Sequence, residues 1–200
     1  MLDFFSINFK FVNLKRMIQR KKKLIFVSGG ARSGKSSFVE EWAKKNGKNI
    51  LFIATAQRSD EEMDERINNH IKNRPKAWKT LEKKLNISES FNNSYKKYDT
   101  IILDCINLLS SNALLELPKN STQIESDIAV MNQIDDIIKI YNNYSATWLI
   151  VTNEVGLGLV PSSKLGRLFR DSLGRANQKL ANIADEVIFM VSGIPLYIKK

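Results

Sequence analysis

Residues 29–36, Gly-Gly-Ala-Arg-Ser-Gly-Lys-Ser, restrict the possible fold of this chain more than any other stretch. They follow the pattern G-x-x-x-x-G-K-S and lie between a short apolar run and a segment with helical periodicity. Small residues in such a turn let backbone N–H groups surround anionic oxygens. The pattern predicts a phosphate-binding loop, in which Lys35 neutralises the β- and γ-phosphates of a nucleoside triphosphate and the Ser36 hydroxyl ligates Mg²⁺.

Apolar runs and amphipathic segments alternate along the rest of the chain. Short apolar runs that indicate strands buried on both faces occur at 24–28, 49–54, 100–103 and 147–152. Helical patterns follow the loop to residue 45 and cover 59–73, 106–116, 123–143 and 162–183, and a hairpin is expected at 186–199 around Gly193-Ile194-Pro195. Such alternation predicts an α/β fold, of the three-layer P-loop NTPase type, with a mainly parallel sheet and a C-terminal β-hairpin.

Polar or glycine residues follow the ends of the predicted parallel strands: Gly29, Thr55, Asp104 and Asn153. In open α/β sheets ligands bind beyond the carboxyl ends of the strands, so we expect these four positions to converge on one edge. A carboxylate at Asp104 can hold Mg²⁺ directly or through water. It can also cap the helix that begins near Ile106, and the two roles are compatible.

The chain has one histidine, His70, on the predicted helix at 59–73. His70 borders an apolar stripe, follows Arg66 by one helical turn and precedes Arg74 by another. Spacing alone favours an inert, hydrogen-bonded histidine at the edge of the core. The alternative is a nucleophile, because nearby positive charge disfavours imidazolium and keeps the ring able to attack phosphorus.

Much of the positive charge of the chain lies in its N-terminal segment. The net charge is +10, and the first 23 residues carry seven basic side chains against one acidic one. A basic tail is more often solvated than bound to nucleic acid or lipid. No apolar run reaches the roughly 18 residues that span a bilayer, and the single cysteine, Cys105, fits a reducing cytosol.

We therefore expect a cytoplasmic protein with no membrane insertion and no specific nucleic-acid partner. Residues 1–22 are expected to be a basic extension outside the core, either flexible or upstream of a true start at Met17. Residues 23–200 are expected to form one P-loop nucleotide-binding catalytic domain.

Together these motifs resemble the bifunctional adenosylcobinamide kinase / adenosylcobinamide-phosphate guanylyltransferase family of cobalamin biosynthesis. The resemblance covers nearly everything from Leu24 onward. Its most specific stretches are R-I-x-x-H-x-x-x-R-P-x-x-W-x-T-x-E at 66–82 and V-T-N-E-V-G-x-G-x-V-P at 151–161. One departure is Asn73, where many members have glycine, and asparagine also tolerates positive φ.

The resemblance implies two reactions that use ATP or GTP with Mg²⁺. A nucleoside triphosphate phosphorylates adenosylcobinamide, and GMP from GTP then passes through a guanylyl-histidine to give adenosylcobinamide-GDP and pyrophosphate. The implied catalytic residues are His70 and Lys35, and a homo-oligomer, with a trimer as the expected form, is also implied. The implied nucleotide contacts are Gly29, Gly30, Ala31, Arg32, Ser33, Gly34, Lys35, Ser36, Thr55, Ala56, Gln57, Ile71, Lys72, Asn73, Arg74, Glu82 and Asp104.

Two polar segments have more than one interpretation. Glu154 precedes Gly156 and Gly158 and is either a general base for the cobinamide hydroxyl, an outer ligand of Mg²⁺, or a turn cap. The helix at 162–183 has a polar side that is either solvated or binds phosphates or another subunit; it carries Arg167, Arg170, Asp171, Gly174 and Gln178.

Two other functions stay open. The net positive charge is the reason to consider a P-loop ATPase stimulated by nucleic acid, which would bind DNA or RNA in a salt-sensitive way. A guanylyltransferase that has lost its kinase activity is the other, because the sequence does not identify the base of the kinase step.

Overall fold

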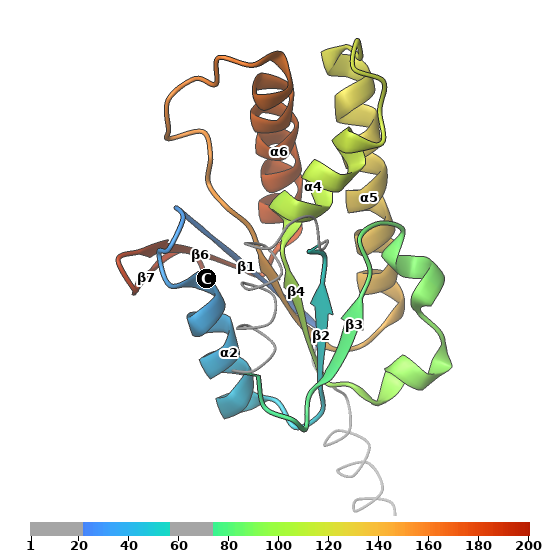
Figure 1. The fold of residues 1–200 in the computed structure, drawn as a ribbon. Helices are drawn as coiled ribbons and strands as arrows, with labels where there is room; N and C mark the ends of the chain where they lie inside the picture. Colours follow the sequence, from blue (N-terminus) through green and yellow to red (C-terminus); the bar gives the residue numbers. More distant parts are fainter. Residues whose placement is uncertain (1–21, 57–73) are drawn as a thin grey trace, which may run out of the picture.

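The computed structural model describes residues 22–56 and 74–200. They form a seven-stranded sheet in the order β3-β2-β4-β5-β1-β6-β7, with helices on both faces (Figure 1). The strands are β1 Lys23–Gly29, β2 Ile50–Ala54, β3 Lys79–Glu82, β4 Thr100–Asp104, β5 Thr147–Val151, β6 Glu186–Val191 and β7 Ile194–Lys199. The helices are α2 Lys35–Asn46, α4 Ile106–Leu115, α5 Gln123–Asn143 and α6 Lys164–Ile183, with short 3₁₀ turns η1 Ile87–Ser90 and η2 Asn93–Lys97.

The sheet is parallel from β3 to β6, and only β7 runs antiparallel to its neighbour. β1 lies inside the sheet between β5 and β6. This arrangement confirms the predicted α/β class, with its mainly parallel sheet and C-terminal hairpin. It also brings the carboxyl ends of β1, β2, β4 and β5 to one edge.

Alternation along the buried strands divides the core between the two faces. In β1, Ile25 and Val27 pack with Val39 of α2 on one face. Leu24 and Phe26 point to the other face, which α4, α5 and α6 cover (Figure 1). Both faces of β1 are therefore dry, as expected of a strand that reads as a continuous apolar run.

Two details differ from the sequence predictions. β3 was not predicted, because it has four residues and two of them are exposed at the sheet edge. The hairpin turns at Ser192-Gly193, both with positive φ, while Ile194 and Pro195 already pair with β6. The predicted helix at 59–73 lies entirely outside the described residues. Within the described part, no helix is long and apolar enough to cross a bilayer.

Candidate active site

The phosphate loop joins β1 to α2, and two of its glycines are required by their surroundings. Gly29 has φ +154°, and a Cβ there would lie 2.6 Å from the carbonyl oxygen of Met190. Gly34 has φ +93°, and its Cβ would lie 3.1 Å from Gly193 Cα. The β6–β7 hairpin thus packs against the loop, and the Gly193 N–H donates to the Ser33 carbonyl at 3.0 Å.

Lys35 is the first residue of α2, and its side chain folds back over the loop. Its Nζ donates to the carbonyl oxygens of Gly29 and Gly30, at 3.0 and 2.6 Å. Burial lowers the pKa of Lys35, while the negative charge of Cys105, if ionised, and of Asp104 would raise it. The ammonium therefore lies where phosphates would be held, in surroundings with little water to compete for it.

Ser36 and Asp104 meet beside this lysine. The Ser36 hydroxyl donates to Asp104 Oδ2 at 3.1 Å, which joins the start of α2 to the end of β4. The helix after β4 takes Cys105 as its N-cap, so Asp104 does not cap it. The described residues contain no cluster of three or more His, Cys, Asp or Glu side chains fit for a metal. A hydroxyl and a carboxylate still suit Mg²⁺, which usually takes its other ligands from water and substrate phosphates.

Thr55, directly after β2, forms a buried link between β2 and β4. Its hydroxyl donates to the Cys105 carbonyl at 2.8 Å and accepts from the Cys105 N–H at 2.9 Å. The Thr55 N–H donates to the Asp104 carbonyl, and Asn112 of α4 donates to the Thr55 carbonyl. The side chain is fully buried, so its evident contribution is to fix the backbone that carries Asp104.

Arg74 brings a second positive charge to this edge. Its guanidinium lies over the ring of Phe52, 3.4 Å from the centroid, and its buried Nε has no hydrogen-bond partner among the described residues. Burial lowers the pKa of Arg74, and the nearby carboxylates of Asp104, Glu40 and Glu82 oppose that shift. Glu82 reaches the edge because β3 pairs it with Ala54, which in turn pairs with Asp104.

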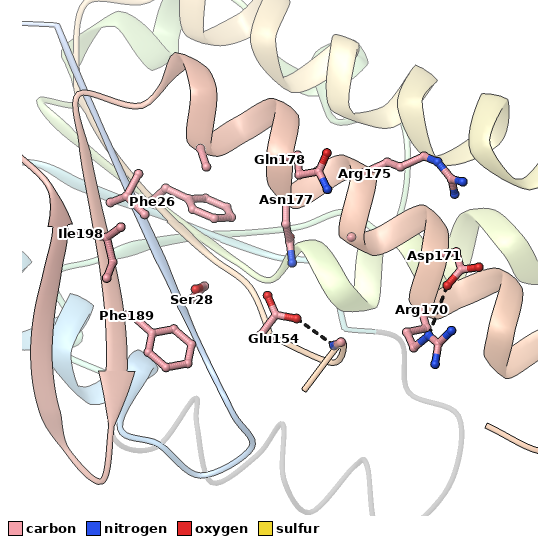
Figure 2. A pocket seen from close by; sticks show the side chains of 14 residues that line it. Phe26, Ser28, Glu154, Arg170, Asp171, Arg175, Asn177, Gln178, Phe189 and Ile198 are labelled. Carbon is pink, nitrogen blue, oxygen red and sulfur yellow. Dashed lines mark hydrogen bonds and ion pairs between the residues drawn. The ribbon is translucent and has the colours of Figure 1, made fainter. Parts of the chain in front are cut away.

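Glu154 approaches the same loop from β5. Its backbone N–H donates to the Gly29 carbonyl at 3.0 Å. Its carboxylate Oε1 accepts the N–H of Gly156 at 2.7 Å, which fixes the side chain (Figure 2).

The described part of the chain therefore brings several predicted site residues together at the carboxyl edge: the loop, Thr55, Arg74, Glu82 and Asp104. Within the loop, Ala31 and Arg32 are exposed, and Arg32 has φ +56°. Ala56 is half-buried beside Thr55. The remaining predicted residues, His70, Gln57, Ile71, Lys72 and Asn73, lie outside the described residues.

Sequence reasoning did not single out the residues that support the site: Met190 and Gly193 under the loop, Asn112 behind Thr55, and Phe52 beneath Arg74. Each is far in sequence from the residue that it supports. No local spacing could have indicated these pairings.

Comparison with known proteins identifies the family. The sequence model described as cobinamide kinase / cobinamide phosphate guanyltransferase matches residues 25–198. The bifunctional adenosylcobalamin biosynthesis protein CobU of Escherichia coli K12 is 38% identical over 181 residues, which span 88% of this chain and 99% of the relative. Its counterpart in Salmonella typhimurium LT2 is 41% identical with the same coverage.

More distant similarities follow. The protein CobP of Pseudomonas aeruginosa PAO1, with the same descriptive name, is 32% identical over 86% of this chain and 95% of the relative. The flagellar accessory protein FlaH from Methanocaldococcus jannaschii gives a TM-score of 0.48 at 14% identity, over 90% of this chain and 79% of that chain. The family assignment rests on the sequence matches. They show that this chain belongs to the cobinamide kinase / cobinamide phosphate guanyltransferase family of adenosylcobalamin biosynthesis.

Proposed function

We propose that a single phosphate cradle, residues 29–36, holds the donor nucleotide for both reactions of the family. The observation that carries this proposal is the convergence of Lys35, Ser36 and Asp104 at one end of β1 and β4. The two reactions break different bonds of a triphosphate, but both require charge neutralisation on the β- and γ-phosphates. One cradle can serve both if the attacking group differs.

In the kinase reaction, the hydroxyl of adenosylcobinamide attacks the γ-phosphorus of ATP or GTP. The O–P bond forms as the bond to the β-phosphate oxygen breaks, and the nucleoside diphosphate leaves. Lys35 stabilises the charge that collects on the phosphates, and the loop N–H groups hold them in line. This step needs mainly positioning and electrostatics from the protein.

In the guanylyl transfer, His70 is the proposed attacker of the α-phosphorus of GTP. Pyrophosphate leaves while the cradle neutralises it, and GMP stays on the imidazole. A phosphate oxygen of adenosylcobinamide phosphate then displaces the histidine to give adenosylcobinamide-GDP. Support for His70 comes from its being the only histidine and from its match to the motif at 66–82.

The Ser36 hydroxyl and the Asp104 carboxylate are the proposed ligands of Mg²⁺. The bound cation would neutralise charge on the phosphate oxygens. The distance of 3.1 Å between Ser36 Oγ and Asp104 Oδ2 supports this proposal, because two oxygens so close together can share one cation. The guanine nucleotide is proposed to contact Thr55, Ala56, Gln57, Ile71, Lys72, Asn73, Arg74 and Glu82 as well as the loop.

The wider setting is proposed on the same basis. Residues 23–200 form one catalytic domain, which a family match over 25–198 supports. The protein is cytoplasmic, which its single buried cysteine supports. It acts on adenosylcobinamide and its phosphate as a homo-oligomer, for which the trimer remains the expected form.

A matched pair of lysine variants tests the single cradle. Lys35→Met removes the ammonium over the loop, whereas Lys44→Met removes an exposed lysine from the last turn of the same helix. The assay follows γ-phosphoryl transfer to adenosylcobinamide and formation of the α-labelled GMP adduct, with separation of the corrinoid products. Lys35→Met should depress both reactions by about a hundredfold or more. Loss of one reaction alone would mean two separate donor sites.

A further inference from the structure

A hollow lies next to the phosphate loop, on the α6 face of the sheet (Figure 2). Its volume is about 730 Å³, within the ~300–1,000 Å³ of small-molecule sites. One wall is apolar, with Phe26 of β1 and Phe189 of β6. The opposite wall is polar, with Glu154 after β5 and Arg170 and Gln178 of α6.

This pocket and the phosphate loop share a border. Ser28 lines the pocket, and the next residue, Gly29, begins the loop. Glu154 lines the pocket with its side chain, while its backbone N–H donates to the Gly29 carbonyl. A molecule in the pocket therefore lies within one residue of the cradle that holds the donor phosphates.

We propose that this pocket is the acceptor site, in which Glu154 takes the proton of the corrinoid's hydroxyl and Arg170 holds the phosphate that replaces that hydroxyl. The proposal rests on the proposed function and adds to it the place and the residues of the second substrate. The pocket would take the arm of the acceptor that carries the reacting oxygen, with its apolar wall against the hydrocarbon part of that arm.

The Glu154 carboxylate suits a hydroxyl better than a donor phosphate. One of its oxygens, Oε1, is held by the Gly156 N–H. The other has no hydrogen-bond partner among the described residues, and it carries negative charge that would repel a triphosphate. As the hydroxyl oxygen bonds to the γ-phosphorus and the nucleoside diphosphate leaves with the broken bond's electrons, the hydroxyl proton passes to this carboxylate.

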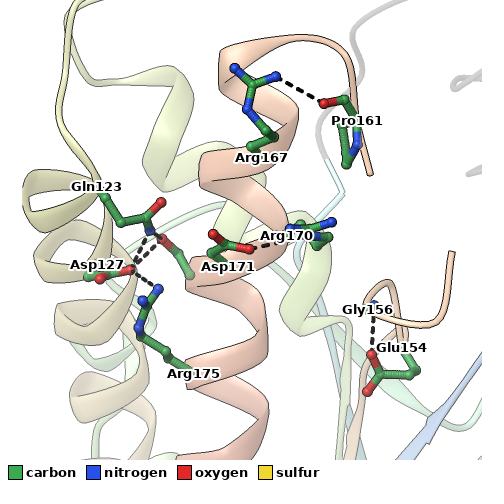
Figure 3. Close-up of polar contacts among 10 residues, drawn as sticks. Gln123, Asp127, Glu154, Gly156, Pro161, Arg167, Arg170, Asp171 and Arg175 are labelled. Carbon is green, nitrogen blue, oxygen red and sulfur yellow. Dashed lines mark hydrogen bonds and ion pairs between the residues drawn. The ribbon is translucent and has the colours of Figure 1, made fainter. Parts of the chain in front are cut away.

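The three arginines of α6 have different hydrogen-bond and ion-pair partners (Figure 3). Arg167 donates to the backbone carbonyls of Pro161 and Ser162, and Arg175 donates to Asp127 of α5. Arg175 also lines the pocket, but Asp127 accepts from Gln123 and Ser172 as well, so the Arg175 guanidinium is held in the contact between α5 and α6.

Arg170 is placed differently from these two. Its ion pair is with Asp171, the next residue in the chain, whose side chain is 42% exposed, while that of Arg170 is only 23% exposed. A guanidinium that is largely covered, lines a pocket and has only its exposed chain neighbour for a counter-ion suits a phosphate dianion, which it can bind through two N–H groups.

The choice of occupant follows from these two residues together. A guanine base would meet a carboxylate and an arginine with no phosphate for the arginine to bind. An acceptor that is first an alcohol and then a phosphate monoester uses both, one in each reaction. The guanine base is therefore the competing occupant that the experiment must distinguish.

Three variants of the full-length protein test the proposal. Glu154→Gln removes the base, and Arg170→Gln removes the phosphate partner. Gly174→Leu fills the pocket without removing charge: a Cβ at Gly174 meets no atom within 4 Å, and leucine is the better helix former. Lys179→Gln is the control, because it removes a positive charge from α6 at a residue paired with Asp135, outside the pocket.

Three rates are measured: labelling of the protein by α-labelled GTP without acceptor, phosphorylation of adenosylcobinamide, and GMP transfer to adenosylcobinamide phosphate. Lys179→Gln should match the wild type in all three rates. The three pocket variants should still form the GMP adduct, because that reaction uses no acceptor. Glu154→Gln should lower kcat of the kinase reaction by about 10²–10⁴-fold. Arg170→Gln should raise KM for adenosylcobinamide phosphate by about tenfold or more, and Gly174→Leu should impair both acceptor reactions.

Two results would overturn the acceptor assignment. If Gly174→Leu and Arg170→Gln abolish labelling by GTP alone, the pocket holds the donor's base. If all three variants match Lys179→Gln in both acceptor reactions, the pocket binds neither substrate. A wild-type protein that labels with GMP but never modifies the corrinoid would count instead against the proposed function.

Discussion

Lys35 and Glu154 donate to the same atom, the carbonyl oxygen of Gly29. The Lys35 Nζ lies 3.0 Å from it and the Glu154 backbone nitrogen also lies 3.0 Å from it. One residue thus belongs to the phosphate cradle and the other to the neighbouring pocket, and a single peptide joins them. Gly29 itself cannot take a side chain, because a Cβ there would meet the Met190 carbonyl and Ser33 Oγ.

Gly29→Ala should destabilise the protein, whereas Gly30→Ala should not. An alanine Cβ at position 29 would lie 2.6 Å from the Met190 carbonyl and 2.7 Å from Ser33 Oγ, but at position 30 it meets no atom within 4 Å. We expect the free energy of unfolding to fall by about 1–3 kcal/mol for Gly29→Ala and to change by less than about 0.5 kcal/mol for Gly30→Ala. Urea unfolding measures the free energy of both variants. Equal losses of stability would show that the hairpin does not pack closely against Gly29.

Nucleotide affinity should begin to fall at a lower pH than it would if Lys35 had the pKa of an ordinary lysine. Burial lowers the pKa of Lys35 below 10.5, so the ammonium loses its proton at a lower pH, and with it the attraction for phosphates. Lys35→Arg keeps its charge throughout this range and should bind with a flatter pH profile. Titration of triphosphate binding between pH 7 and 10.5 measures the effect. Parallel profiles for the two proteins would mean that Lys35 does not contact the phosphates.

Asp104→Asn should weaken the binding of the Mg²⁺ that accompanies the nucleotide. Loss of the carboxylate leaves Ser36 with an amide in place of its acceptor at 3.1 Å and removes one negative charge from the cation site. The Mg²⁺ concentration for half-maximal nucleotide binding should rise by about 10–100-fold. Asp99→Asn is a suitable comparison, because Asp99 accepts backbone N–H groups of Lys48 and Asn49 at the opposite end of β4. An unchanged Mg²⁺ requirement in Asp104→Asn would exclude this carboxylate as a ligand.

Thr55→Val should lower the free energy of unfolding, although valine has nearly the same shape as threonine. The fully buried hydroxyl makes two hydrogen bonds to the Cys105 backbone. Valine leaves the Cys105 N–H without a partner, whereas the Cys105 carbonyl still accepts the N–H of Leu109. We expect a loss of about 1–3 kcal/mol in the free energy of unfolding. Thr80→Val on β3 is the matched control, with a change within about 0.5 kcal/mol, because this threonine is only partly buried. Equal values for the two variants would contradict the structural role of Thr55.

The sequence was informative wherever structure follows from short-range pattern. The strand, loop and helix around residues 29–36 are marked by a buried apolar run, small residues and a helical period, all within about 20 residues. The convergence of the positions that follow the strand ends, Gly29, Thr55, Asp104 and Asn153, also followed, because parallel strands share one carboxyl edge. Helices α4, α5 and α6 begin and end within two residues of their predicted limits.

Long-range contacts could not be predicted in this way. The hydroxyl of Thr55 bonds to Cys105, 50 residues away, and the loop rests on Met190 and Gly193. The pocket beside Glu154 has walls from β1, the segment after β5, α6 and β6. These segments are far apart in sequence, so no local pattern indicates that they meet. The sequence left the polar side of α6 open between solvation and binding of phosphates or another subunit. The partners and the burial of each side chain, which the structure provides, distinguish Arg170 from Arg167.

The central claim is that one cradle serves two attackers, with His70 as the attacker of the α-phosphorus. The most direct measurement is covalent labelling by α-labelled GTP in wild type, His70→Asn and Lys35→Met, with kinase activity followed in parallel. We predict an acid-labile GMP adduct on the wild type, no adduct on His70→Asn with its kinase activity retained, and loss of both activities in Lys35→Met. An adduct that persists in His70→Asn would contradict the account.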